Sequence, residues 1–161
     1  FVGIEEFSEK KEIFIQPDEE KKASDFLKEN NITVGDLLIG ISATAGIKLR
    51  ECMPEKFVIL ADQLIEKIKA KVIFVGSSDD RPVIEKIQKM MKNNSVNAAG
   101  VFKLYELAAL MRNLKLFVSV DCGPLYVADA VGVPSVVIAG SVDMREQHPL
   151  NSPYKIIQKN I

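Results

Sequence analysis

Apolar residues occur along the chain in two alternating patterns. Short runs of valine, isoleucine, leucine and phenylalanine, bounded by glycine and polar residues, predict buried strands. We expect these strands at residues 37–41, 72–75, 96–99, 116–120 and 134–139. Between the runs, apolar residues spaced three and four positions apart predict amphipathic helices with one buried face. The predicted helices cover residues 17–30 and 124–131 and begin near Pro54, Asp80 and Leu104.

Turn and capping residues support these helix boundaries. Pro17 and Pro54 each stand in a predicted first turn, where proline costs no backbone hydrogen bond. Asp79 or Asp80 is expected to cap the helix that follows the second strand. The helical side chains expected to face the core are Ala23, Phe26, Leu27, Phe57, Leu60, Ala61, Leu64, Ile68, Ile84, Ile87, Met91, Leu104, Leu107, Ala108 and Met111.

Strands that are apolar on both faces and alternate with amphipathic helices are typical of a parallel sheet covered on both sides. Right-handed crossovers then favour a Rossmann-like, doubly wound α/β fold. Residues 1–16 show no clear element, and we interpret them as a linker or the remnant of a preceding domain. Residues 17–161 are expected to form one α/β domain. Because the chain begins with Phe1 instead of methionine, we interpret it as a fragment.

Composition excludes several classes of protein. Of 161 residues, 47% are hydrophobic and 27% are charged, which disfavours intrinsic disorder. The net charge of −1 gives no overall field for nucleic acid, and no apolar run approaches the ~20 residues of a membrane span. Cys52 and Cys122 lack metal-ligand spacing, so no metal is expected, and unpaired cysteines favour a cytoplasmic location. The single histidine, His148, lies in a polar loop, which disfavours a hydrolase.

The loops that follow the strands are where an open parallel sheet binds ligands. The most informative is the segment from Asp121 to Pro134, in which Gly123 permits a tight turn and Pro124 suits the first helical position. The helix start after Gly123 is a candidate anion site, at which a diphosphate could accept two or three charge-assisted hydrogen bonds. The alternative is that Gly-Pro merely forms a turn.

Other phosphate motifs are absent from the chain, and one reactive group lies in this segment. The chain has neither a Walker A loop nor a G-x-G-x-x-G after its first strand, which disfavours ATPases and ordinary dehydrogenases. Cys122 could be a nucleophile, because a helix N-terminus can lower the pKa of a thiol. No histidine lies near it in sequence, so this hypothesis is disfavoured.

The segment Asp-x-Gly-Pro-x-x-x-Ala-x-Ala-x-Gly-x-Pro resembles the C-terminal domain of family 9 glycosyltransferases, the heptosyltransferases of lipopolysaccharide core assembly. The resemblance covers about residues 37–158 and includes three further stretches, at residues 40–57, 100–108 and 140–144. It implies the C-terminal, donor-binding half of a GT-B fold. It also implies metal-independent transfer with inversion, in which a nucleotide-diphosphate sugar such as ADP-heptose is the donor. The acidic base and the acceptor site would belong to an N-terminal domain, so no catalytic residue is expected here.

By this resemblance, the substrate-binding residues are Arg50, Asp80, Asp121, Cys122, Gly123, Pro124 and Tyr126. Arg50 stands where the family has a phosphate-binding lysine, with Lys48 as the rival, and Gly123 begins the diphosphate site. Asp80 would bind the ribose or only cap a helix, and Asp121 would shape the turn by accepting backbone N–H bonds. Glu106 is a further match that is more readily an exposed helix residue.

Besides Arg50 in place of a lysine and the loss of both prolines from the turn at residues 140–144, four substitutions depart from the family pattern. Cys122 replaces a hydroxyl residue, Tyr126 a histidine, Phe102 a threonine or serine, and Cys52 a tryptophan. Because of these departures, the sequence does not determine which nucleotide sugar is the donor.

The resemblance also implies partners and a location. The partners would be the nucleotide-diphosphate sugar and, through the other domain, a lipid-linked or oligosaccharide acceptor, with no cofactor and no nucleic acid. The location would be the cytoplasm or the inner face of the inner membrane. Two alternatives stay open: a non-catalytic nucleotide-sugar-binding or regulatory Rossmann module, and a free-standing flavodoxin-like domain.

Overall fold

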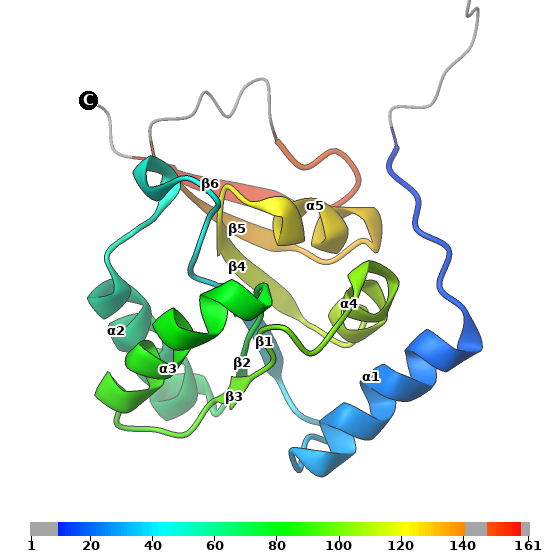
Figure 1. The fold of residues 1–161 in the computed structure, drawn as a ribbon, viewed down its shortest axis with the longest axis horizontal. Coiled ribbons are helices and arrows are strands. Elements are labelled where there is room, and N and C mark those ends of the chain that lie inside the picture. The colour runs from blue at the N-terminus through cyan, green and yellow to red at the C-terminus, as the bar shows by residue number, and fades with distance from the viewer. Residues whose placement is uncertain (1–9, 141–147, 159–161) are drawn as a thin grey trace, which may run out of the picture.

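A computed structural model of the chain describes residues 10–140 and 148–158. Strands and helices alternate along nearly all of it (Figure 1). In chain order the helices are α1 (Pro17–Glu29), η1 (Lys48–Arg50), α2 (Pro54–Ile68), η2 (Ser78–Asp80), α3 (Arg81–Met90), α4 (Leu104–Met111) and α5 (Gly123–Ala130), where η marks a 3₁₀ turn. The strands are β1 (Leu38–Ser42), β2 (Lys71–Phe74), β3 (Val96–Asn97), β4 (Leu116–Val120), β5 (Ser135–Ala139) and β6 (Tyr154–Gln158).

The strands form one parallel sheet in the order β3-β2-β1-β4-β5-β6. The chain builds outward from β1 in one direction and from β4 in the other, so the strand order reverses between these two strands. This order is that of a doubly wound Rossmann sheet and confirms the predicted fold class. Since all strands are parallel, the loops that follow them share one edge of the sheet.

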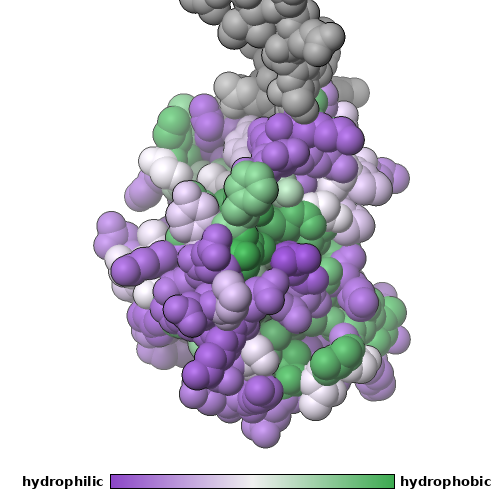
Figure 2. All heavy atoms as spheres, turned by 90° about the vertical axis from the view of Figure 1, so that its right-hand side faces the viewer, coloured by the Kyte–Doolittle hydropathy of each residue, from purple (hydrophilic) through white to green (hydrophobic). Residues whose placement is uncertain are grey.

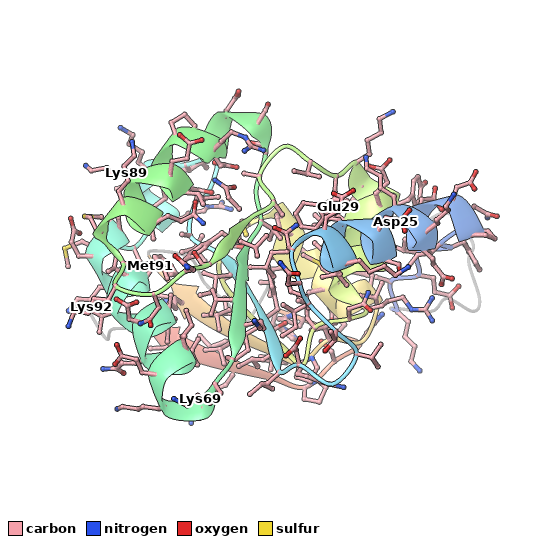
Figure 3. The ribbon with its side chains drawn as sticks, turned by 90° about the horizontal axis from the view of Figure 1, so that it is seen from below. Asp25, Glu29, Lys69, Lys89, Met91 and Lys92 are labelled. Carbon is pink, nitrogen blue, oxygen red and sulfur yellow. The ribbon has the colours of Figure 1, made fainter. Side chains whose placement is uncertain are left out.

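Two apolar clusters cover the two faces of the sheet. On one face α1, α4 and α5 pack on a cluster that includes Leu27, Leu110 and Phe117. On the other face α2 and α3 pack on a cluster that includes Phe57 and Ile84. Each helix leads into the amino end of the strand that follows it, so the helix C-termini lie toward the amino edge of the sheet; Figure 3 labels Glu29, Lys69 and Lys89 near the ends of α1, α2 and α3. The helix N-termini therefore lie at the carboxyl edge.

Most of the helical side chains predicted to be buried are buried or half-buried, with two exceptions. Ile68 is 49% exposed because α2 ends there, and Lys69 takes a left-handed conformation that turns the chain away. Leu104 is 55% exposed because it is the first residue of α4, before the helix reaches the core. The buried stripe of α2 therefore ends one turn before the position predicted from the spacing of its apolar residues.

One strand was not predicted. β6 pairs with β5 at the edge of the sheet, from Tyr154 opposite Ser135 to Gln158 opposite Ala139. Its residues are exposed except for the half-buried Ile156, so it lacks the continuous apolar run of the central strands. In addition, β3 is limited to Val96–Asn97, shorter than the predicted 96–99.

The segment before α1 contacts the domain although it has no regular secondary structure. Ile13 and Ile15 pack against the cluster under α1, α4 and α5. The Lys11 Nζ atom lies 3.1 Å from the Asp129 Oδ2 atom in α5. The predicted boundary at residue 17 stays a prediction, and residues 1–9 lie outside the described part.

The face that carries α1 and this segment is mostly hydrophilic, with apolar side chains grouped in small areas (Figure 2). Phe14 is 75% exposed in the segment before α1. Across the described residues, no helix has both the length and the apolar composition needed to cross a membrane.

Candidate functional site

The sharp turn between β4 and α5 lies where the strand order reverses. Ser42 ends β1 and is aligned with Ser119 of the neighbouring β4. The Cys122 thiol lies 3.4 Å from the Ser42 hydroxyl oxygen, so a side-chain contact bridges β1 and the turn after β4. In doubly wound sheets, ligands bind at this reversal, outside the carboxyl ends of the strands.

The first turn of α5 offers an open approach but few free amides. A Cβ atom added at Gly123 would meet nothing within 4 Å, so the corner is not covered by described side chains. Pro124 is the second residue of α5, not the first as predicted, and has no N–H. The Leu125 N–H donates to the Cys122 carbonyl at 3.1 Å. Of the first three helical positions, only Gly123 therefore has an uncommitted amide in the described part, fewer than the two or three donors expected.

The positive charge at this corner comes from Arg50, the last residue of η1. Its Nη1 atom donates to the Asp121 Oδ2 atom at 2.8 Å, and the side chains are 33% and 1% exposed, respectively. The Tyr126 hydroxyl donates to the other oxygen, Oδ1, at 3.2 Å. Asp121 was expected to accept backbone N–H bonds. Instead, its recorded hydrogen bonds come from these side chains, because its carboxylate lies between η1 and α5.

Burial sets the protonation states around Asp121. Desolvation, with the nearby Asp121 charge, raises the pKa of the Tyr126 hydroxyl to about 12, so the phenol stays a hydrogen-bond donor. Burial likewise raises the pKa of the Cys122 thiol above its ordinary value. A raised pKa keeps this thiol neutral, which argues against a thiolate nucleophile activated by the helix end.

A close backbone approach fixes the turn that carries Arg50. A Cβ atom at Gly140, after β5, would lie 2.7 Å from the Leu49 carbonyl oxygen. Glycine lets the two loops pack at this distance. The rival cation, Lys48, is exposed at the beginning of the same turn.

A buried hydroxyl that sequence reasoning missed also belongs to the loop after β1. Thr44 is 5% exposed, and its Oγ1 atom has no hydrogen-bond partner among the described residues. A buried hydroxyl without a partner is costly unless a ligand or water satisfies it. The signal available in the sequence was a polar pair, Ser42 and Thr44, directly after an apolar strand.

Asp80 lies on the same edge of the sheet, after β2. Its Oδ2 atom accepts hydrogen bonds from the Ser77 amide and the Ser77 hydroxyl, both at 2.7 Å. Asp80 is the N-cap residue of α3, as predicted, but its side chain closes the turn η2 and makes no capping hydrogen bond to α3. No contact is recorded in the described part between Asp80 and the group around Arg50.

Glu106 and Phe102 lie at the start of α4 and have packing roles toward α1. Glu106 accepts hydrogen bonds from the Lys22 ammonium at 2.7 Å and the Lys103 amide at 2.6 Å, which lower the pKa of its carboxyl. The Phe102 ring contacts Phe26 of α1 edge-on, with 5.0 Å between the ring centroids. Both connect the α4 region to α1.

The remaining candidates are also placed by their packing. Cys52 packs, half-buried, against the cluster under α2 and α3. The His148 ring lies 5.5 Å from that of Tyr154, the first residue of β6, and so at the amino edge, opposite Cys122. A Cys122–His148 pair is therefore excluded. Residues 141–144 of the predicted glycine turn lie outside the described residues.

An acid that sequence reasoning missed is Asp129 in α5. Fully buried, it accepts hydrogen bonds from the amides of Leu150, Asn151 and Ser152 at 2.8–3.0 Å. Although burial alone would raise its pKa, these bonds and Lys11 lower it. The sequence feature that could have revealed Asp129 is an acid inside an otherwise apolar helix. Asp129 ties the loop before β6 to α5 and has a structural role.

Elsewhere the described chain offers a cavity but no metal cluster. Within residues 10–140 and 148–158, no three His, Cys, Asp or Glu side chains gather as metal ligands. A cavity of about 430 Å³ opens at the amino edge, between α1 and the end of α4. Its basic lining residues are Lys28, Arg112 and Lys115.

Comparison with known proteins identifies similar chains. The model of glycosyltransferase family 9 (heptosyltransferase) matches residues 1–161. Lipooligosaccharide heptosyltransferase 2 of Haemophilus influenzae is 32% identical over 103 residues, which are 62% of this chain and 30% of that protein.

Two solved structures share the fold. A glycosyl transferase family 9 protein from Veillonella parvula superposes with a TM-score of 0.88 at 25% identity, over 91% of this chain and 42% of that one. The ADP-heptose lipopolysaccharide heptosyltransferase II of Escherichia coli superposes with a TM-score of 0.79 at 21% identity, over 91% of this chain and 44% of that one. The chain thus spans less than half the length of each of these relatives.

Proposed function

Because the chain belongs to glycosyltransferase family 9, we propose that it binds the nucleotide-sugar donor of a heptosyltransferase at the Gly123 corner. The single observation that carries this proposal is the Arg50–Asp121 pair, which holds a cation beside the open start of α5 at the strand reversal. The domain, residues 17–161, would be the C-terminal half of a GT-B enzyme. Arg50 is preferred to Lys48 because its guanidinium is held at this corner.

The donors at the corner suit a diphosphate. Arg50 presents a planar guanidinium, of which one nitrogen is engaged with Asp121 and the others can bind phosphate oxygens. The Gly123 amide and the Thr44 hydroxyl would add neutral donors. During glycosyl transfer, negative charge grows on the leaving diphosphate, so these donors would stabilise the transition state more than the bound substrate.

The remaining contacts would determine which nucleotide sugar the site binds. Asp80 would bind a ribose hydroxyl through Oδ1, since its recorded bonds to Ser77 use Oδ2. Cys122 keeps a neutral thiol beside the first turn of α5 and would be a weaker donor than a hydroxyl. The relative from Escherichia coli is described as an ADP-heptose enzyme, so we propose ADP-heptose as the donor.

The rest of the reaction would need a second domain. An acidic base there would deprotonate the acceptor hydroxyl, which would attack the anomeric carbon with inversion as the diphosphate leaves. The acceptor would be the lipopolysaccharide core, in the cytoplasm or at the inner face of the inner membrane. The isolated chain would bind donor and transfer no sugar.

Calorimetric titration of the chain with ADP-heptose, ADP and UDP tests this proposal. We expect ADP-heptose and ADP to bind and UDP to bind more weakly. Arg50→Ala should weaken ADP binding by about 1.5–3 kcal/mol, the value of charge-assisted hydrogen bonds. Lys48→Ala is the matched control and should leave affinity unchanged. Absence of heat for all three ligands at millimolar concentration would contradict the proposal.

A further inference from the structure

We propose that Tyr126 and Asp121 are positioning residues, which hold the Arg50 guanidinium in place for the diphosphate without contacting the ligand themselves. The inference rests on the proposed function and assigns the site a mechanism of preorganisation. Three residues from two loops and a helix form one chain of hydrogen bonds, from the Tyr126 phenol through the Asp121 carboxylate to Arg50.

Arg50 needs such a support because its own backbone does little to restrict the conformations of its side chain. It ends a 3₁₀ turn of three residues, and its neighbours Ile47 and Leu49 are 51% and 78% exposed. A long side chain on an exposed turn samples many rotamers, and immobilising it on binding costs affinity. The buried Asp121 carboxylate removes that freedom before the ligand arrives.

Asp121 in turn is oriented by Tyr126. The phenol donates to Oδ1 and the guanidinium to Oδ2, so the two donors fix the plane of the carboxylate and do not compete. A phenol that stays protonated cannot repel the carboxylate. Tyr126 therefore acts on Arg50 through Asp121.

The Tyr126 ring also contacts the segment before α1. The Lys11 ammonium lies 5.3 Å from the centre of the Tyr126 ring, a cation–π distance. The same ammonium is paired with the buried Asp129, one turn further along α5. Lys11 thus contacts two side chains of α5, Tyr126 and Asp129, and the contacts that support Arg50 are continuous from Lys11 to the corner.

A double-mutant cycle separates positioning from direct contact or support of the fold. ADP affinity is measured by calorimetry for the wild-type chain, Tyr126→Phe, Arg50→Ala and the double variant. If Tyr126 acts through Arg50, Tyr126→Phe should weaken binding about three- to tenfold in the wild type and less than about twofold in the Arg50→Ala background. Tyr105→Phe, on the exposed surface of α4, is the matched control and should change nothing.

Each other outcome decides the question. An equal loss in both backgrounds would mean that Tyr126 acts independently of Arg50, and no loss in the wild type would mean that it does not act at all. Either result overturns the inference while leaving the proposed function standing. If the wild-type chain does not bind ADP, the proposed function fails instead.

A ligand-free measurement tests positioning even if ADP does not bind or Arg50→Ala binds too weakly to measure. In ¹⁵N NMR relaxation, the Arg50 Nε–H vector should be rigid in the wild type and mobile in Tyr126→Phe. Equal mobility in the two proteins would overturn the inference. Tyr105→Phe again serves as the control for general loosening.

Discussion

Arg50→Ala should destabilise the fold as well as weaken binding, because it leaves the Asp121 carboxylate short of a partner. That carboxylate is 1% exposed, and Arg50 supplies one of its two recorded donors. Breaking a fully buried pair costs about 3–5 kcal/mol. Since the Arg50 side chain is one-third exposed and water can enter the space it vacates, we expect a smaller loss, about 1–2 kcal/mol.

Urea unfolding at neutral pH, followed by circular dichroism, measures this loss. Lys48→Ala, on the same turn but exposed, should lie within about 0.5 kcal/mol of the wild type. Asp121→Asn combined with Arg50→Ala should be more stable than Arg50→Ala alone, because the uncompensated charge is gone. If Arg50→Ala were as stable as Lys48→Ala, the Asp121 pair would not exist in solution, and the origin of the corner's charge would have to be reconsidered.

Three further predictions concern packing and protonation. Gly140→Ala should cost about 1–3 kcal/mol in urea unfolding, because its Cβ would meet the Leu49 carbonyl at 2.7 Å; unchanged stability would refute that close approach. Asp129→Asn should cost about 1–3 kcal/mol at pH 7, and because the pKa of Asp129 is lowered from 3.8, the cost should persist above that value and shrink as the pH falls below it. A cost independent of pH down to 2 would contradict the lowered pKa. In ultraviolet titration, the last tyrosine of the wild type should ionise near pH 12 and be missing from Tyr126→Phe; ionisation of all tyrosines near pH 10 would disprove its burial beside Asp121.

The central part of the fold could be predicted from the sequence because its strands are buried on both faces. β1 and β4 read as continuous apolar runs, and the helix stripes face them with helical spacing. The edge strand β6 could not be recognised in this way, because exposure on an edge removes the apolar run. Ile68 was misplaced because spacing alone does not show where α2 ends.

The local geometry of the candidate corner could be predicted, but the side-chain contacts that connect it could not. The β4–α5 corner follows from the glycine, the proline and the apolar strand before them, all local signals. The pairing of Asp121 with Arg50 joins residues far apart in sequence, and no local pattern encodes it. The pKa direction of Cys122 was missed for the same reason, since burial by distant segments decides it.

A crystal structure of the chain with ADP bound tests the central claim most directly. The diphosphate is predicted to lie against the Gly123 amide, with the Arg50 guanidinium on its oxygens and still paired with Asp121. Density for the nucleotide at the opposite edge, in the basic cavity lined by Arg112 and Lys115, would contradict the claim.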